Sequence, residues 1–243
     1  MSRSHANLQL VRPLADPLPL APIPALVSAS ILVNPPVWPP EPGYPHVVAS
    51  VLAAFRPRFQ AAQQETAAAP CLLEDLLQHS PERREMLARN SRRFRSLALC
   101  GLLLDYGTFE AAEQHPAESE RLANLCLLLV DALDGEWYGE RLLDDTRSRC
   151  WSLVSDSRGA TGDLQGAEEA LWTAEAHLQR GTHDPLERAY WMACKARLRR
   201  TQHRNHESAD LFRSTLPIFL WAGKTHLAAE SALELARLEG TRT

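Results

Sequence analysis

The chain has 243 residues, of which 45% are hydrophobic and 23% are charged, and its formal net charge is -4. This composition is ordinary for a folded protein and argues against wholesale disorder. The acidic balance argues against a general nucleic-acid binder, because such proteins carry a basic excess that neutralises phosphates. Alanine and leucine are abundant while strand-forming residues are scarce, so we predict an all-α fold with almost no strand.

The first 45 residues are rich in proline, since eleven of the seventeen prolines lie at or before Pro45. Proline lacks the backbone N–H donor and fixes φ, so we predict an extended or disordered tail over residues 1–45. A linker is the simplest interpretation of this tail. A ligand for a proline-reading module is the alternative.

An apolar stretch within the tail, Leu18–Val33, raises the alternative of a secretory signal peptide, because Arg3 and Arg12 precede it. Three prolines inside the stretch interrupt any helix there, so we expect a cytoplasmic protein instead. The sequence also lacks the run of about eighteen apolar residues that a membrane-spanning helix requires. We therefore expect no membrane contact.

Residues 46–79 are predicted to be an N-terminal helical segment that packs on the rest of the chain. The apolar spacing indicates a helix over 46–69, which Pro57 either kinks or restarts. A short helix over 71–78 is expected to follow it.

Residues 80–243 are predicted to be one domain of successive helices. Ser80 and Pro81 form its first start signal, with serine as the N-cap and proline in the first turn, and this helix is expected to continue to about Tyr106. Apolar periodicity and turn residues define the later helices. Their predicted ranges are 116–134, 138–160, 164–180, 185–203, 206–222 and 225–238.

Residues 150–179 carry the most specific pattern in the chain. Trp151 lies early in a first helix, Gly162–Asp163 form a turn, and the small residues Ala167 and Ala174 lie in a second helix. Tryptophan fills the space between paired helices, and small residues let them approach closely. The pattern resembles a tetratricopeptide repeat. The resemblance implies antiparallel helix hairpins stacked into a right-handed α-solenoid.

A second, weaker match spans residues 193–221, with Ala209 at the position of Ala167. Arg204 and His206 stand where the turn glycine and the aromatic residue after it are expected. The 42 residues between Ala167 and Ala209 exceed the usual repeat of about 34, so helices or loops must be longer than the family norm. Two further stretches, 91–100 and 181–188, resemble a group of uncharacterised bacterial repeat proteins.

No nucleotide-binding, hydrolase or metalloprotease signature occurs in the sequence. The five cysteines form no C-x-x-C pair, so we expect them to be reduced and buried. His203 and His206 are close in sequence, but a tetrahedral metal site needs three or four ligands. Asp144 and Asp145 point about 100° apart on a helix and cannot converge as an acid–base pair by themselves. We therefore expect no enzyme activity, no cofactor and no metal.

Two predicted helices, those over 80–106 and 185–203, are rich in arginine. Arginine is suited to recognising carboxylates or phosphates, so an acidic ligand is one interpretation. Ion pairing with acidic residues of neighbouring helices is the interpretation we favour. Those acidic residues include Glu118, Glu120, Glu136 and Glu140.

Tryptophans in the helical region are expected mostly in the core. Trp191 is singled out because the repeat pattern places it on the groove-lining side of its helix, near Lys195 and Leu198. An aromatic ring beside a cation is a typical anchor for a bound partner. A core position for Trp191 is the equal alternative.

The leading hypothesis is a non-catalytic scaffold that binds a peptide or a protein, and no nucleic acid, on the concave face of the solenoid. The residues predicted to form this face are Arg149, Ser152, Asp156, Trp191, Lys195 and Leu198. A regulatory or sensor module in bacterial signalling or transcription control is the second hypothesis. The sequence leaves the partner and the oligomeric state open.

Overall fold

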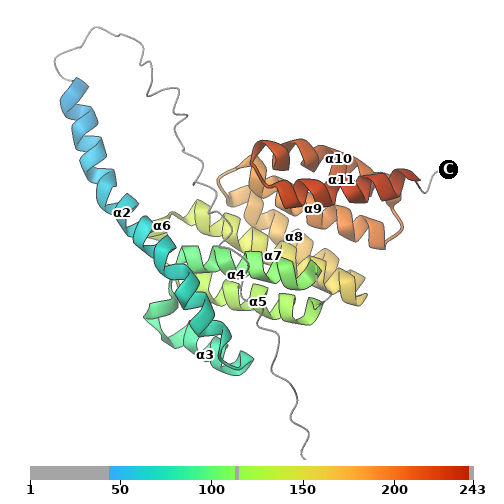
Figure 1. Cartoon of the computed structure of the whole chain (residues 1–243), viewed down its shortest axis with the longest axis horizontal. Helices are drawn as coiled ribbons and strands as arrows, with labels where there is room; N and C mark the ends of the chain where they lie inside the picture. Colours follow the sequence, from blue (N-terminus) through green and yellow to red (C-terminus); the bar gives the residue numbers. More distant parts are fainter. Residues whose placement is uncertain (1–43, 113–114, 241–243) are drawn as a thin grey trace, which may run out of the picture. The chain divides into compact units, whose positions relative to one another are not determined.

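The computed structural model describes residues 44–112 and 115–240, and no strand occurs within these ranges (Figure 1). The chain divides into two units between Ala54 and Phe55, and the first helix begins in one unit and continues in the other. The all-α prediction is confirmed. The elements are α2 (Tyr44–Leu77), α3 (Pro81–Asn90), the 3-10 helix η1 (Arg92–Phe94), α4 (Leu97–Ala112), α5 (Pro116–Val130), α6 (Gly135–Tyr138), α7 (Glu140–Thr161), α8 (Leu164–Arg180), α9 (Pro185–Thr201), α10 (Asn205–Trp221) and α11 (Thr225–Gly240).

Helix α2 is continuous where the sequence predicted two helices. Pro57 and Pro70 both lie inside it. The predicted break at Pro70 is therefore wrong. Each proline removes one backbone hydrogen bond, but Ala67–Ala69 before Pro70 are strong helix formers and keep the helix continuous. Tyr44 and Pro45 belong to this helix, so the predicted tail boundary at residue 45 is wrong by two residues. The rest of the predicted tail, residues 1–43, lies outside the described residues.

The helix predicted over 80–106 is interrupted, forming α3, η1 and α4 instead. Ser80 caps α3 as predicted, since its hydroxyl accepts a hydrogen bond from the backbone N–H three residues later. At the break Phe94 is only 2% exposed and packs into the core. The Ser96 hydroxyl then accepts a 3.0 Å hydrogen bond from the Leu99 N–H, as an N-cap does. Burial of Phe94 and capping by Ser96 therefore interrupt the helix, although the apolar periodicity alone predicts that it continues.

Helix α5 carries the apolar stripe predicted for it. Its buried members are Leu122, Leu125, Cys126, Leu129 and Val130. The helix ends at Val130, earlier than predicted, because Asp134 caps the short helix α6 by accepting from the N–H groups of Glu136 and Trp137. The helix predicted over 138–160 is α7, which begins two residues later than predicted, at Glu140. Gly139, at φ +90°, separates α6 from α7, a backbone conformation that favours glycine.

The turn between α7 and α8 is formed by Gly162 and Asp163, as predicted. Gly162 has φ +89°, in the left-handed region. The Asp163 carboxylate accepts a 2.9 Å hydrogen bond from the Gly166 N–H and caps α8. Asp184 caps α9 in the same way, 2.8 Å from the Leu186 N–H.

Gly162→Ala is expected to lower the free energy of unfolding by about 1 kcal/mol, because a Cβ strains the left-handed conformation. Gly101→Ala is the matched control. A Cβ at Gly101, inside α4, meets no atom within 4 Å, so alanine is expected to be neutral or stabilising there. Urea denaturation measures both values. Equal effects would show that the turn conformation carries no strain.

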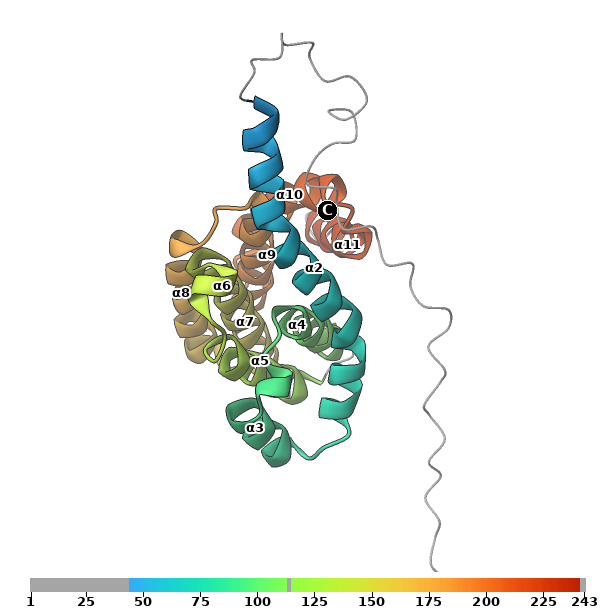
Figure 2. The same cartoon turned by 90° about the vertical axis from the view of Figure 1, so that its left-hand side faces the viewer.

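The helices of the second unit contact one another pairwise. Helix α4 contacts α7, and α7 contacts α9. Helix α5 packs against α4 and α7, α8 against α7 and α9, and α10 against α9 and α11. Figure 2 views several of these helices nearly along their axes, with α3 and α5 toward one end and α10 and α11 toward the other. Consecutive helices from α7 onward therefore pair as neighbours.

Small residues permit the close contacts in this stack. A Cβ at Gly107 of α4 would lie 2.7 Å from Cδ2 of Leu153 on α7, so only glycine fits without displacing that leucine. Ala167 and Ala174 of α8 are buried against α9, as the repeat pattern predicted. Across the described part of the chain, no helix is both long enough and apolar enough to cross a membrane.

Candidate functional site

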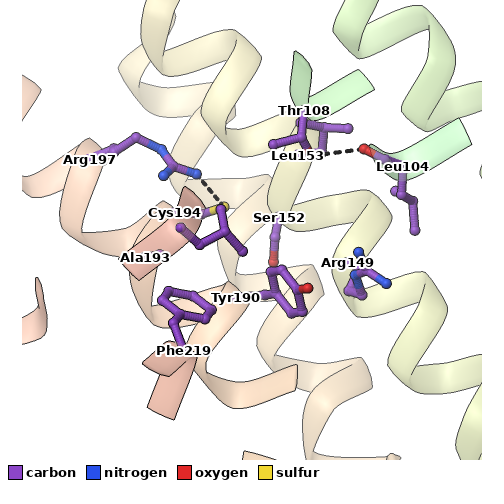
Figure 3. A pocket seen from close by; sticks show the side chains of 11 residues that line it. Leu104, Thr108, Arg149, Ser152, Leu153, Tyr190, Ala193, Cys194, Arg197 and Phe219 are labelled. Carbon is purple, nitrogen blue, oxygen red and sulfur yellow. Dashed lines mark hydrogen bonds between the residues drawn. The ribbon is translucent and has the colours of Figure 1, made fainter. Parts of the chain in front are cut away.

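Three of the six predicted face residues, all on α7, lie near one another. Arg149 and Ser152 line a small pocket that also receives side chains from α4, α9, α10 and α11 (Figure 3). Asp156 lies one helical turn beyond Ser152, and its carboxylate is 2.7 Å from Nε of Arg197 on α9. The structure thus brings these three residues together on one side of the stack.

The other three predicted residues do not join this face. Trp191 is 8% exposed, and its indole N–H donates a 3.2 Å hydrogen bond to the Leu171 carbonyl of α8. Leu198 is 2% exposed and packs in the same cluster as Trp191. Lys195 lies beside them, with Nζ 4.5 Å from the Trp191 ring centre. The core alternative therefore holds for Trp191, and the prediction that Leu198 lies on the face is wrong, because α9 buries this side against α8.

Lys195 and part of Trp191 instead border a wider pocket of about 590 Å³ between α8, α9 and α10. Its rim carries negative charges from Glu175 and Asp184 and a positive charge from Arg188. A single face that combines these residues with Arg149 is not present in the structure.

Tyr190, and not the adjacent Trp191, faces Arg149. Its ring centre lies 4.4 Å from the guanidinium carbon of Arg149 and 5.7 Å from the ring centre of Phe219. Neighbouring positions of a helix point about 100° apart, so a one-residue displacement selects a different side. The spacing of Tyr190 and Arg197, seven residues apart on one side of α9, was the signal that could have revealed this face.

The small pocket has a volume of about 40 Å³. Its walls are mostly apolar and come from Leu104, Leu153, Ala193, Phe219 and Leu227. Its polar lining groups belong to Thr108, Arg149, Ser152, Tyr190 and Arg197. In the view of Figure 3 the Ser152 hydroxyl points toward the Tyr190 ring, between Arg149 and Cys194.

Arg149 holds a guanidinium whose charged contacts are long. Its side chain is 22% exposed, with Nη2 3.4 Å from Asp105 and Nε 3.9 Å from Glu187. Charge-assisted hydrogen bonds are usually about 2.7–2.9 Å long. Burial by itself lowers the pKa of Arg149, but the carboxylates of Glu187 and Asp105 raise it overall, so the group stays charged. Arg149 therefore has donors to offer to a bound group.

Ser152 is the clearest indication that the pocket binds something. The residue is 2% exposed, and its hydroxyl has no hydrogen-bond partner among the described residues. Leaving a buried hydroxyl unpaired costs about 1–3 kcal/mol, and such groups are normally paired with protein or ordered water. The hydroxyl lines the pocket, so a water or a ligand there would satisfy it.

Arg197, by contrast, is fully engaged. Its guanidinium donates hydrogen bonds to Asp156 at 2.7 Å, to Glu230 of α11 at 3.0 Å and to the Cys194 sulfur at 3.2 Å. Burial opposes its charge, but the pKa is raised overall by Asp156 and its other neighbours. Arg197 therefore connects α7, α9 and α11 and holds one end of the pocket.

Glu187 is a mostly buried acid beside Arg149. Burial raises its pKa to about 7, although Arg149 acts in the opposite direction. Its Oε2 atom has no hydrogen-bond partner among the described residues. We call the following set the charged face: Asp105, Arg149, Asp156, Glu187, Arg197 and Glu230. Carboxylates outnumber guanidinium groups on it, so it does not favour a polyanion.

The arginine-rich helices form ion pairs with neighbouring helices, which confirms that interpretation for several residues. Arg84 lies 2.7 Å from Glu118. Arg199 pairs with Glu168 of α8, and Arg200 pairs with Glu234 of α11.

Two of the tryptophans expected in the core are exposed instead. Trp172 is 64% exposed and Trp221 is 81% exposed, because both lie on outer sides of their helices.

The neighbouring acids Asp144 and Asp145 serve different contacts, as their helical spacing predicted. Asp145 is 2% exposed and accepts hydrogen bonds from the Thr182 N–H and hydroxyl, which holds the loop between α8 and α9. Asp144 lies 2.7 Å from Nδ1 of His177 and 3.4 Å from Nε of Arg180. Burial raises the Asp144 pKa, but these two partners lower it overall.

The cysteines are free thiols. Four are buried, but Cys71 is exposed, so the expectation that all are buried is wrong for that residue. Burial raises the pKa of the Cys194 thiol to about 12, which leaves almost no reactive thiolate at neutral pH. Over residues 44–112 and 115–240, no group of three His, Cys, Asp or Glu side chains is placed to hold a metal ion.

The charged face and its pocket thus offer buried donors, an unpaired hydroxyl and apolar walls. Searches of protein-family models, curated proteins and solved structures for similarity to this chain find no match.

Proposed function

We propose that this protein is a non-catalytic binding protein that holds a peptide or protein segment on the charged face. Arg149 is the observation that carries the proposal. Its guanidinium is mostly buried, lies against Tyr190, and makes only long contacts to Asp105 and Glu187 within the described residues. A desolvated guanidinium beside a tyrosine is typical of the anchor positions of protein interfaces.

The helix packing supports a repeat scaffold for this face. The pairs α4–α5, α7–α8 and α9–α10 are each in contact, and α4, α7 and α9 are neighbours in turn. We propose that these pairs are repeats of a right-handed, tetratricopeptide-like α-solenoid whose first helices carry the partner. In such repeats each hairpin packs on the next, so residues far apart in sequence converge on one surface.

A peptide fits the charges better than a nucleic acid does. The charged face has four carboxylates, on Asp105, Asp156, Glu187 and Glu230, around two guanidinium groups. A phosphate backbone would be repelled there. The free cysteines support a reducing, cytoplasmic location for this binding protein.

A random peptide display library selected on the full chain tests the proposal. The selected peptides are titrated by fluorescence anisotropy against Asp105→Asn/Glu230→Gln, which removes two partly exposed charges of the face. Asp210→Asn/Glu239→Gln is the matched control, because it removes two similarly exposed charges around Arg213, outside the face. We expect about tenfold weaker binding to the first variant and less than about twofold change for the control.

Two outcomes would contradict the proposal. One is that no selected peptide binds in solution. The other is that both variants weaken binding equally, which would place the contact elsewhere. Circular dichroism of each variant establishes that the helices are retained.

A further inference from the structure

The small pocket next to Arg149 combines hydrogen-bond donors and acceptors in one place. Arg149 supplies only donors. The Thr108 hydroxyl already donates to the Leu104 carbonyl at 2.8 Å, so its oxygen is left to accept. Ser152 has an unpaired hydroxyl that can do either. A complementary group must therefore carry an acceptor and a donor together.

The charges around the pocket disfavour an ionic group. Each lining guanidinium already faces two carboxylates: Arg149 faces Asp105 and Glu187, and Arg197 faces Asp156 and Glu230. A bound carboxylate would be repelled by these acids. A bound ammonium would meet the two guanidinium groups that line the pocket directly. A neutral group avoids repulsion by the acids and by the guanidinium groups.

The volume limits the size of this group. About 40 Å³ is room for roughly three waters, at about 10–15 Å³ each on the same measure. A carboxamide has three atoms larger than hydrogen. The leucine and phenylalanine walls at Leu104, Leu153 and Phe219 suit the methylene that carries such a group.

We infer that the pocket binds a primary carboxamide, the side chain of an asparagine or glutamine in the bound peptide. The carbonyl oxygen accepts from Arg149 and Ser152, and the amide N–H groups donate to Thr108. This inference rests on the proposed function for the source of the carboxamide. It makes the pocket the place where the charged face distinguishes an amide from the corresponding acid.

Acetamide is the probe for the pocket alone. It is titrated into isotope-labelled full-length chain, with acetate and methylammonium as charged probes of matched size, and backbone amide shifts are followed by NMR. We expect millimolar binding of acetamide, with shifts centred on Ser152, Leu153 and Tyr190. Binding of acetate or methylammonium should be at least about fivefold weaker.

Ser152→Ala is expected to weaken acetamide binding by about three- to tenfold, since it removes one hydrogen bond. Ser155→Ala is the matched control, because Ser155 is also a buried, unpaired serine of α7 but does not line the pocket. Equal effects of the two substitutions would overturn the assignment. So would acetate binding as tightly as acetamide, or no binding of any probe, which would mean that the pocket holds ordered water only.

An experiment with the selected peptides distinguishes the carboxamide inference from the proposed function. In each selected peptide, asparagine or glutamine is replaced by aspartate or glutamate, and we expect about a tenfold loss of affinity at one position. Peptides that bind the charged face without such a position would overturn the carboxamide inference and leave the proposed function intact. Acetamide binding without any peptide binding would contradict the proposed function and leave the carboxamide site intact.

Discussion

Phe219→Ala is expected to lower the free energy of unfolding by about 3–5 kcal/mol, the range for removing a buried phenylalanine ring. Phe219 is completely buried on α10 and packs with Ala189 and Ala193 of α9 and with Leu227 and Ala228 of α11. The three alanines among these neighbours cannot expand to fill the space. A cavity would therefore remain where three helices meet, and its lost contacts add to the lost transfer free energy.

Leu220→Ala is the control for Phe219→Ala, because the adjacent side chain is 60% exposed. Its effect is expected to stay within about 0.5 kcal/mol, since an exposed leucine has few contacts to lose. Urea denaturation followed by circular dichroism measures both. Hydrogen exchange should show the loss of protection concentrated in α10 and α11. Similar effects of the two substitutions would mean that α10 does not pack through Phe219.

The stability of the protein is expected to fall as the pH rises through the titration of Glu187. Its pKa is about 7 in the folded chain, against an ordinary value of 4.5, because burial disfavours the charged form. The folded state therefore holds this proton more tightly than the unfolded state does. The stabilisation is complete below about pH 4.5 and is lost by about pH 7, a change of about 3 kcal/mol.

Glu187→Gln should abolish this particular decline, since glutamine mimics the protonated acid. The unfolding free energies of the two proteins should be similar below about pH 4.5 and should diverge progressively between about pH 4.5 and pH 7, with the variant the more stable. Other titrating groups cancel in the difference. Glu239→Gln, at a half-exposed site on α11, is the control for a general charge effect. Parallel pH profiles for wild type and Glu187→Gln would contradict the assignment.

Local signals in the sequence were sufficient for most of the helices. The caps at Ser80, Asp163 and Asp184 act through backbone N–H groups a few residues away, so their chemistry is readable from neighbouring positions. Gly162 marks a turn for the same local reason. The apolar stripe of α5 also predicted its buried side, because helical period and burial are directly linked.

Two predictions were decided by a distant contact. Phe94 interrupts a predicted helix because the core of the second unit receives its ring, which no local pattern reveals. Trp191 was predicted either to line a groove or to lie in the core, and its indole bonds to α8 twenty residues earlier in the chain. The adjacent Tyr190 faces Arg149 instead. A helical residue can be assigned to a side only once the rotation of its helix against its neighbours is known.

The sequence by itself determined the helical class, most helix boundaries and the close packing at Ala167 and Ala174, because propensity, capping and small-residue spacing act over a few positions. Only the tertiary structure decided which side chains meet at the candidate site. Ser152, Tyr190 and Arg197 come together from α7 and α9, and Glu230 joins them from α11. Their convergence depends on how whole helices pack, which is a property of the complete core rather than of any local segment.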